Sequence, residues 1–503
     1  MRKHITFILN GEEQQVSNLA GDTTFLNWLR LSRKMTGSKE GCAEGDCGAC
    51  TVVVARPDET GALHWRPVNA CILFVGMLEG ASVTTVEGLS TNWAAPAQGM
   101  HPVQQAMVDC HGSQCGFCTP GFVMSLFAAW CNGAGLDEDT IDDVLAGNLC
   151  RCTGYRPIVE AGLSLQNEVV PDFEQNRREQ EAAMIAAIAH SDTVMLGNDR
   201  NCFVAPARAA EFARSYMQTP DATIVSGATD VGLWVTKQNR LLPTMLWTGR
   251  VAGFDQIKID TARLRFGPAV THEQALTVIA PRWPEIAETM RRFGSAQVRA
   301  TGTLCGNVAN GSPIGDLPPM LMALGAEVEL THGNASRLIP LESFFVTYGQ
   351  QDRAEGEFVS SVILPSASLP TLRCYKLSKR FDQDISAVMG AFVISHVDGV
   401  ITAARLAFGG MAGIPQRANT VEAYLVGKPL TTASFAHAAH LLPEDFSPLS
   451  DMRGSAAYRM QAASNLILKY GIDICEGTQI RLAGRHAESS LAALETAAAG
   501  ASS

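Results

Sequence analysis

The cysteine pattern constrains the fold of this chain more than any other feature. Ten of the 14 cysteines lie before residue 153, and only Cys202, Cys305, Cys374 and Cys475 follow. The apolar run at residues 5–9 is too short for the core of a secretory signal, so we expect a cytoplasmic, reducing location. Cysteines there serve as metal ligands, catalytic thiols or buried small side chains rather than as disulfides. The N-terminal third therefore has a different task from the rest of the chain.

The stretch CAEGDCGAC places Cys42, Cys47 and Cys50 close together, and Cys71 follows in NACIL. We call these four cysteines the first set. A C-x4-C-x2-C spacing with a distant fourth cysteine is that of plant-type 2Fe–2S sites. Glycines at positions 41, 45 and 48 permit positive φ and let backbone N–H groups approach the sulfur atoms. A structural zinc site is the alternative, although zinc sites usually show paired short spacings.

A second set of cysteines occurs in two pairs, Cys115 with Cys118 and Cys150 with Cys152. A disulfide across the single residue of the latter pair would be strained, because disulfide Cα separations fall in a narrow range. Two helices are expected between the pairs, and antiparallel packing would bring all four thiols to one end. A thioredoxin-like disulfide lacks its βαβ context here, and zinc remains an alternative. The neighbouring ferredoxin-like loop favours iron–sulfur.

Composition limits the class of protein. A chain of 503 residues exceeds the roughly 250–300 residues that one core can hold, so several domains are expected. Its 46% hydrophobic and 18% charged residues are ordinary for a globular protein. A net charge of −11 without a basic cluster disfavours nucleic-acid binding. No stretch approaches the roughly 18 apolar residues of a membrane span, so we expect no membrane association.

Local patterns predict a small β-grasp fold followed by helices. Asn10-Gly11 is a favoured two-residue hairpin turn between short strands. Asp22 or Thr23 would cap a short helix, and Gly147 would end the last of the N-terminal helices. The expected elements are a hairpin over 4–16, a helix over 25–32, a strand over 51–55, a helix over 121–130 with one apolar face, and a helix over 136–147.

Two glycine-containing loops follow a polar segment at 162–200, which we expect to be a partly helical inter-domain linker. The first, TIVSGATDVGL (223–233), predicts a strand over 222–226 that runs into a turn. The backbone N–H groups of this turn suit a pyrophosphate, and a plain turn is the alternative. The second, TGTLCGNVANGSPIGDLPP (301–319), offers small side chains for close backbone approach and amide and carboxylate groups for hydrogen bonds.

In combination, GCAEGDCGACTV, SQCGFCTPGF and GNLCRCTGYRPI resemble the iron–sulfur region of the molybdenum hydroxylases, the family of xanthine dehydrogenases and aldehyde oxidases. The resemblance covers roughly residues 1–475. It implies that the first set binds one 2Fe–2S cluster, that the second set binds another nearer a molybdenum cofactor, and that Gln114 faces the pterin. The metal ligands implied are Cys42, Cys47, Cys50, Cys71, Cys115, Cys118, Cys150 and Cys152.

The two loops resemble those of the vanillyl-alcohol-oxidase-type FAD domain that this family uses. Cys305 stands where glycine is usual, and Phe293 matches an aromatic residue that packs near the flavin ring, with an ordinary core Phe as the alternative. Segments 379–386 and 408–418 resemble the family's C-terminal flavoprotein domain. The FAD contacts implied are Ile224, Val225, Ser226, Gly227, Ala228, Thr229, Asp230, Val231, Phe293, Thr303, Cys305, Gly306, Asn307 and Asp316.

The resemblance implies a multidomain α+β fold. Its parts would be a β-grasp plant-type ferredoxin domain over 1–88, a four-helix 2Fe–2S domain over 89–165, a linker over 166–195, a vanillyl-alcohol-oxidase/PCMH-type FAD-binding domain over 196–370, a CO-dehydrogenase-flavoprotein-like α+β domain over 371–485, and a disordered tail over 486–503.

The family's large molybdenum-binding portion has no room in this chain, which therefore resembles the small iron–sulfur/FAD subunits of bacterial xanthine dehydrogenases. This implies electron transfer from molybdopterin on a large partner subunit, through both 2Fe–2S clusters and FAD, to NAD⁺ during hydroxylation of hypoxanthine or xanthine to urate. The assembly would be an α2β2 heterotetramer, and no catalytic residue is expected in this chain. The alternatives are the same subunit of an aldehyde or N-heterocycle hydroxylase, and a non-enzymatic iron–sulfur carrier.

Overall fold

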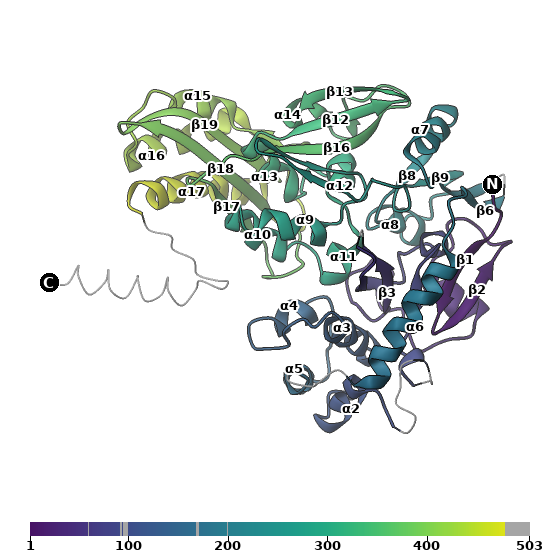
Figure 1. Cartoon of the computed structure of the whole chain (residues 1–503). Coiled ribbons are helices and arrows are strands. Elements are labelled where there is room, and N and C mark those ends of the chain that lie inside the picture. The colour runs from purple at the N-terminus through teal and green to yellow at the C-terminus, as the bar shows by residue number, and fades with distance from the viewer. Residues whose placement is uncertain (59, 91–92, 94–98, 167–170, 199, 478–503) are drawn as a thin grey trace.

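A computed structural model describes the chain except for residues 59, 91–92, 94–98, 167–170, 199 and 478–503 (Figure 1). The tail predicted over 486–503 lies outside the described residues. The predicted multidomain α+β architecture is confirmed, because mixed sheets and helical layers alternate along the chain.

The N-terminal part is a five-stranded sheet in the order β2-β1-β5-β3-β4. The predicted hairpin turns at Asn10 and Gly11, which both have positive φ. The predicted helix over 25–32 exists, but Thr24 caps it instead of Asp22 or Thr23, and it continues as a π turn over Trp28–Ser32. The elements are β1 (Ile5–Leu9), β2 (Glu12–Val16), α1 (Phe25–Asn27), β3 (Thr51–Pro57), β4 (Leu63–Asn69) and β5 (Ser82–Thr84), with 3₁₀ turns at Val75–Leu78 and Gly88–Ser90.

Four helices follow, and the longest packs against β3 and β4. Every residue from Gly121 to Cys131 is buried, so this helix is enclosed on all sides rather than having the single apolar face that was predicted. The helix predicted over 136–147 is shorter and ends before Gly147, with Ala146 at its C-cap. The helices are α2 (Pro102–Asp109), α3 (Thr119–Cys131), α4 (Ile141–Leu145) and α5 (Arg156–Ser164).

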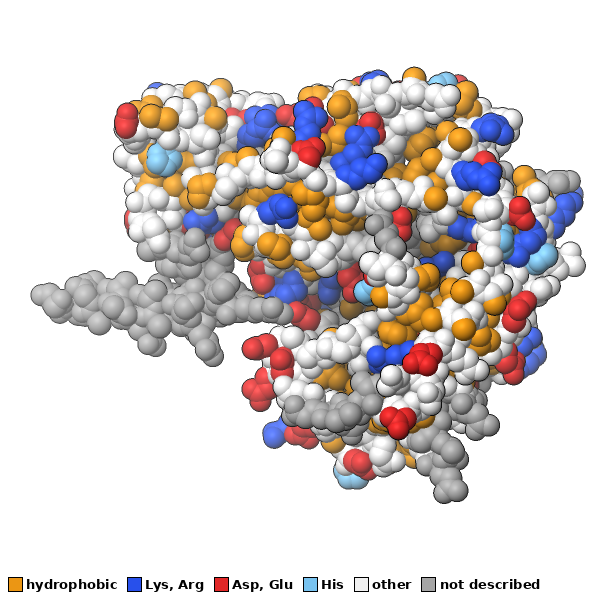
Figure 2. Space-filling view, in the orientation of Figure 1, with side chains coloured by type: hydrophobic (Ala, Val, Ile, Leu, Met, Phe, Trp, Pro, Cys, Tyr) orange, Lys and Arg blue, Asp and Glu red, His pale blue; other side chains and the backbone are white. Residues whose placement is uncertain are grey.

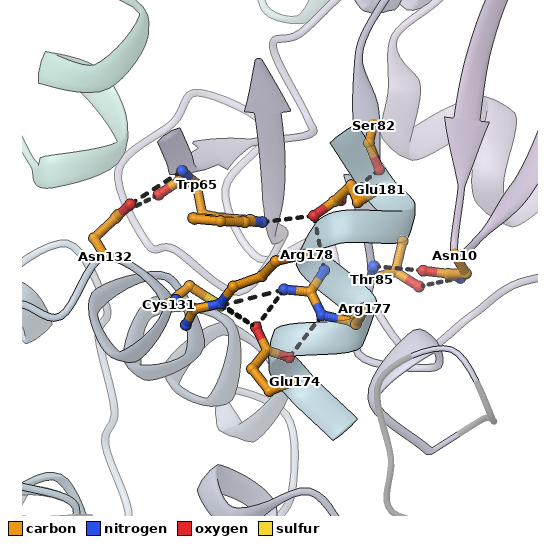
Figure 3. A network of polar contacts seen from close by, with 10 residues as sticks. All are labelled: Asn10, Trp65, Ser82, Thr85, Cys131, Asn132, Glu174, Arg177, Arg178 and Glu181. Carbon is orange, nitrogen blue, oxygen red and sulfur yellow. Dashed lines mark hydrogen bonds and ion pairs between the residues drawn. The ribbon is translucent and has the colours of Figure 1, made fainter. Parts of the chain in front are cut away.

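The predicted linker contains a long helix, α6 (Asp172–Ile188), which crosses both N-terminal parts (Figure 1). Glu181 on this helix accepts hydrogen bonds from Trp65 Nε1 (2.8 Å) and Ser82 Oγ (2.6 Å) of the N-terminal sheet. One turn earlier, Arg177 pairs with Glu174 and Glu181, and Figure 3 shows how this network fills the space between sheet and helices. The described part of the linker is therefore a structural helix with one buried face.

The middle of the chain holds two main sheets with helices around them. Their strand orders are β6-β7-β9-β8 and β10-β11-β16-β12-β13. The elements are β6 (Val194–Asn198), β7 (Asn201–Ala205), α7 (Ala209–Gln218), β8 (Thr223–Val225), α8 (Val231–Thr236), β9 (Thr244–Trp247), β10 (Ile257–Ile259), β11 (Arg263–Phe266), α9 (His272–Ile279), α10 (Pro284–Arg291), α11 (Ala296–Thr301), α12 (Leu304–Asn310), α13 (Leu317–Leu324), β12 (Glu327–His332), β13 (Ala335–Pro340), α14 (Leu341–Phe344), β14 (Phe345–Thr347), β15 (Gln350–Gln351) and β16 (Phe358–Pro365).

The core of the N-terminal sheet runs directly into the first of these sheets. Phe7 and Val52 share one buried cluster with Phe203 and Met245. Burying apolar area stabilises by roughly 25 cal/mol per Å², so this shared cluster holds the two parts together.

The last part is a four-stranded antiparallel sheet, β17-β18-β19-β20, that packs its helices around Phe392 and Tyr470. The elements are β17 (Arg373–Leu377), β18 (Val388–Val397), β19 (Val400–Gly409), β20 (Gln416–Arg417), α15 (Asn419–Leu425), α16 (Thr432–Asp445) and α17 (Ala456–Cys475). Acidic and basic side chains are interspersed on the face drawn in Figure 2. Within the described ranges, none of the helices has the length and apolar character needed to cross a bilayer.

Candidate functional site

The first set of cysteines converges on one loop. The Cys42 thiol lies in hydrogen-bond contact with the thiols of Cys47 and Cys71, and Cys71 contacts Cys50. The Cys47 N–H also donates to Cys42 Sγ at 3.4 Å. Hydrogen bonds from the Cys47 and Cys71 thiols hold the pKa of Cys42 below its usual range, against the opposing effect of burial. The same contacts raise the pKa of Cys47 and of Cys71, because these two thiols share hydrogen bonds with neighbouring sulfur atoms. What the loop supplies for metal ligation is therefore the proximity of its sulfur atoms.

Glycines shape this loop in two ways. Gly45 and Gly48 adopt positive φ, as predicted, whereas Gly41 does not. A Cβ on Gly41 would lie 2.8 Å from Cys47 Sγ, so Gly41 supplies space for the sulfur atom.

The second set also comes together. Cys118 immediately precedes α3, and Cys150 lies in the turn between α4 and α5. The structure pairs Cys115 with Cys152 and Cys118 with Cys150, each within thiol hydrogen-bond contact. Thr153 Oγ1 donates to Cys150 Sγ at 3.2 Å. Because α3 and α4 bring the two pairs to one end, the four thiols lie near one another, and their role as one cluster site stays a prediction.

The thiols of the second set meet in two pairs, whereas in the first set Cys42 and Cys71 each contact two other thiols. Among the described residues, no three or more histidine, cysteine, aspartate or glutamate side chains are placed to hold a single metal ion. A 2Fe–2S cluster is bound by four cysteine thiolates, and each set supplies four cysteines, so the donor chemistry fits such a cluster. Cys110 and Cys131 lie outside both sets, and Cys131 is buried against Glu174 on α6.

A cavity of about 420 Å³ lies where the two glycine-containing loops meet. Small-molecule and cofactor sites commonly have volumes of roughly 300–1,000 Å³. A Cβ on Gly227 would lie 1.9 Å from the Thr301 carbonyl oxygen, so the loops touch through backbone alone. Of the predicted flavin contacts, the lining contains Ile224, Ser226, Gly227, Ala228, Thr229, Asp230, Val231, Phe293, Thr303, Cys305, Gly306 and Asn307.

Polar groups of the cavity are suited to a bound cofactor. Asn307 Oδ1 is buried and has no hydrogen-bond partner among the described residues. Asp230 accepts from Asn310 Nδ2 at 3.0 Å, and burial raises the pKa of its carboxyl. A buried polar atom without a partner costs free energy, so Asn307 favours a ligand that donates to it. These residues fit FAD.

Two predicted flavin contacts lie elsewhere. Val225 is fully buried within β8. Asp316 directly precedes α13, where its side chain makes no capping hydrogen bond; it pairs with Lys376 Nζ at 2.6 Å and accepts a hydrogen bond from Ser386. Both partners of the Asp316–Lys376 pair are buried, so in this structure Asp316 connects the middle and last parts of the chain.

Sequence reasoning missed several lining residues that come from distant elements. Tyr216, Arg353 and Phe358 line one part of the cavity, and His272 meets Phe293 edge-on, with ring centroids 4.9 Å apart. Burial lowers the pKa of His272 to about 3, so the ring is neutral. No local motif marks these residues, because only the packing of separate elements brings them together.

The first set lies next to the cavity. A Cβ on Gly232, in the helix that follows the first glycine-containing loop, would lie 2.7 Å from Ile72 Cβ, and Ile72 neighbours Cys71. Thr236 on the same helix donates to the Ala43 carbonyl at 2.7 Å. The second set connects to the first through the Leu149 N–H, which donates to the Cys47 carbonyl at 3.0 Å.

The fold and these sites define a class of protein, an electron-transfer protein with two iron–sulfur domains and a flavin domain. The matching domain families, in chain order, are the 2Fe–2S iron-sulfur cluster binding domain (residues 7–76), the [2Fe-2S] binding domain (85–163), the FAD binding domain in molybdopterin dehydrogenase (198–367) and the CO dehydrogenase flavoprotein C-terminal domain (373–473). Together these four domains match the iron–sulfur/FAD subunit of the molybdenum hydroxylases, the family that includes xanthine dehydrogenase.

Curated relatives are similar over nearly the whole of this chain. Xanthine dehydrogenase of Emericella nidulans is 29% identical over 95% of the chain, and that of Drosophila pseudoobscura pseudoobscura is 30% identical over 93%. Aldehyde oxidase 1 of Bos taurus is 27% identical over 94%. In each comparison the chain spans only 39% of the relative's length.

Solved structures resemble about half of the chain. Quinoline 2-oxidoreductase from Pseudomonas putida 86 matches 54% of it, and 96% of the solved chain, with a TM-score of 0.50 and 25% identity. Carbon monoxide dehydrogenase from Hydrogenophaga pseudoflava matches 53% of it, and 94% of the solved chain, with a TM-score of 0.51 and 23% identity. At 23% identity, the similarity to carbon monoxide dehydrogenase shows a shared fold only.

Proposed function

We propose that this chain is the electron-transfer subunit of a xanthine dehydrogenase, and that it carries electrons from a molybdenum cofactor on a larger partner to NAD⁺ by way of two 2Fe–2S clusters and FAD. When bound, the clusters supply one-electron transfer and FAD supplies the change to two-electron chemistry. The first and second sets would hold the clusters, and the cavity residues would hold FAD.

The observation that carries the proposal is the position of the two sets. Cys115 and Cys152 are exposed, whereas Cys50 and Cys71 are buried, and Ile72 next to Cys71 contacts Gly232 near the cavity. Electrons arriving from another protein need a surface site, and electrons leaving through FAD need an inner one. Exposure and adjacency therefore support an order from second set to first set to cavity.

Apolar side chains surround the exposed second set. Val108 is 51% exposed, Phe117 46%, Tyr155 39% and Leu149 37%. Apolar groups exposed together commonly mark interaction sites. We assign this surface to the molybdenum-bearing partner, in an α2β2 assembly.

Purines are the proposed substrate class because relatives named xanthine dehydrogenase match nearly the whole chain. An aldehyde or another N-heterocycle is the second candidate, favoured by the aldehyde oxidase and quinoline 2-oxidoreductase similarities. The domain limits proposed are 1–88, 89–165, 196–370 and 371–485, with the linker at 166–195 and a cytoplasmic location.

Replacing one ligand of the second set tests the electron order. Cys150→Ser is expected to remove one of two 2Fe–2S EPR signals and to stop purine-to-NAD⁺ turnover in the full assembly. NADH-to-dye activity is expected to survive, because the first set and the cavity remain intact. Cys110→Ser is the matched control, since Cys110 lies on the same part of the fold but outside both sets.

Loss of the dye activity in Cys150→Ser would contradict the proposed order. Zinc in place of about four irons per chain, the content of two 2Fe–2S clusters, would contradict the cluster assignment itself.

A further inference from the structure

A buried glutamine lies where the flavin part of the chain meets both iron–sulfur parts. Gln297 is on α11 and is fully buried. Its Nε2 lies 3.2 Å from Thr51 Oγ1, 3.1 Å from Ser125 Oγ and 3.2 Å from Asn148 Oδ1. These partners are 149 to 246 residues away in sequence, and all three are themselves buried. One side-chain amide therefore links three separate parts of the fold.

The partners of Gln297 belong to the two cysteine loops. Thr51 directly follows Cys50, and Asn148 precedes Cys150 by two residues. Asn148 Nδ2 donates to the Gly48 carbonyl at 3.1 Å, between two cysteines of the first set. Ser125, on the helix that follows Cys118, donates to Asn148 Oδ1 at 2.6 Å. The Asn148 amide thus contacts both loops, and Gln297 contacts Asn148.

Three glycines make this junction possible. A Cβ on Gly147 would lie 1.8 Å from Gln297 Oε1. A Cβ on Gly48 would lie 2.2 Å from the Gly147 carbonyl, and a Cβ on Gly121 would lie 2.2 Å from the Gly48 carbonyl. The three segments approach so closely that any side chain would separate them. The contact is therefore specific to this arrangement, in which Gln297 Nε2 is hydrogen-bonded and Gln297 Oε1 is buried with no hydrogen-bond partner among the described residues.

We infer that Gln297 is a positioning residue that sets the relative placement of the two cluster loops by fixing the Asn148 amide. This inference rests on the proposed function. Without the Gln297 donor, Asn148 Oδ1 keeps only Ser125, and the amide is then oriented by that contact and by the bonds from Nδ2 to the Gly48 carbonyl and to Thr51 Oγ1 at 3.4 Å. The side-chain anchor between the Cys47–Cys50 loop and the Cys150 turn is then weaker. Hydrogen bonding and solvent exposure tune the potentials of such clusters, so both spacing and potential would change.

The test compares EPR spectra of the reduced full-length protein with its cofactors bound. Gln297→Met keeps the side-chain volume but removes the donor. Losing two neutral hydrogen bonds corresponds to roughly a tenfold to thirtyfold larger population of rearranged junction. We expect a changed magnetic coupling between the two reduced clusters, altered g-values for the first-set cluster and slower internal reduction of FAD, with iron and flavin content retained. Gln461→Met, an exposed glutamine on α17, is the control and is expected to leave every signal unchanged.

Unchanged coupling, g-values and flavin reduction in Gln297→Met would overturn the inference. If that variant fails to fold, Ser125→Ala removes one contact of the same Asn148 amide and is expected to shift the coupling in the same direction; an unshifted coupling would again overturn the inference. Two normal 2Fe–2S signals in the unmodified protein keep the proposed function intact in either case, whereas their absence would contradict the function rather than the role of Gln297.

Discussion

Replacing Arg177 by methionine is expected to destabilise the N-terminal parts strongly. Arg177 lies on α6 with a side chain only 1% exposed, at 2.6 Å from Glu174 and 2.8 Å from Glu181, which are also buried (Figure 3). The variant leaves the buried Glu181 without a cation and leaves Glu174 with Arg178 alone. Removing one partner of a buried ion pair typically costs about 3–5 kcal/mol. A unit of 150–250 residues loses about 2–4 °C per kcal/mol, so a fall of about 6–20 °C is expected.

The loss of stability in Arg177→Met should depend on pH in a defined direction. Burial raises the pKa of Glu174, but hydrogen bonds and charge from Arg177 and Arg178 outweigh it and hold the pKa below its usual value. In the native protein this stabilisation is present above the unfolded pKa of about 4.3 and is lost as the pH falls through the folded pKa. In Arg177→Met only Arg178 still opposes the effect of burial, so the folded pKa of Glu174 rises and the stability deficit grows as the pH rises. The deficit should be larger at pH 8 than at pH 5.

Thermal unfolding of the full chain, followed by circular dichroism at both pH values, measures this effect. Arg178→Met is the matched control, because Arg178 pairs with the same Glu174 at 2.9 Å but has a side chain 25% exposed. Its loss should cost about 1 kcal/mol or less. Equal losses in the two variants, or a deficit in Arg177→Met that shrinks toward alkaline pH, would refute the reasoning.

Two further substitutions test other buried contacts. Gly227→Ala places a Cβ 1.9 Å from the Thr301 carbonyl oxygen. We expect a lower FAD content, measured by flavin absorbance, while the EPR signals of both clusters are retained. An FAD content equal to that of the unmodified protein would contradict the tight loop contact. Lys376→Met leaves the buried Asp316 carboxylate without its cation. The free energy of unfolding, measured by chemical denaturation, is expected to fall by about 3–5 kcal/mol. In the control Lys379→Met, at an exposed residue, it should change by no more than about 0.5 kcal/mol.

Short-range features were predictable from the sequence because they depend on neighbouring residues. The first set of thiols lies largely on one loop, and the Asn10-Gly11 turn follows from the backbone preferences of two residues. The two cysteine pairs of the second set lie at the ends of two short helices. Their approach to one another could therefore be predicted without knowing where each helix begins and ends. The loop glycines at 227 and 306 were likewise visible as positions for close backbone approach.

Long-range polar contacts were not predictable, because nothing local distinguishes them. Asp316 lies in a flavin-like motif, yet it pairs with Lys376, 60 residues later. The segment containing Arg177 looks like a polar linker, and only the tertiary fold buries one face of it between sheet and helices. Gln297 has no motif of its own, since its partners come from three distant segments. Gly147 was predicted as a helix cap, but its role is to admit Gln297.

The unequal burial of the two cysteine sets has a consequence for maturation. Cys50 and Cys71 are each 2% exposed, and within the first set only Cys42 and Cys47 are partly exposed. Cys115 and Cys152 are exposed in the folded chain. A folded chain that lacks iron would therefore be loaded more readily at its outer centre than at its inner one.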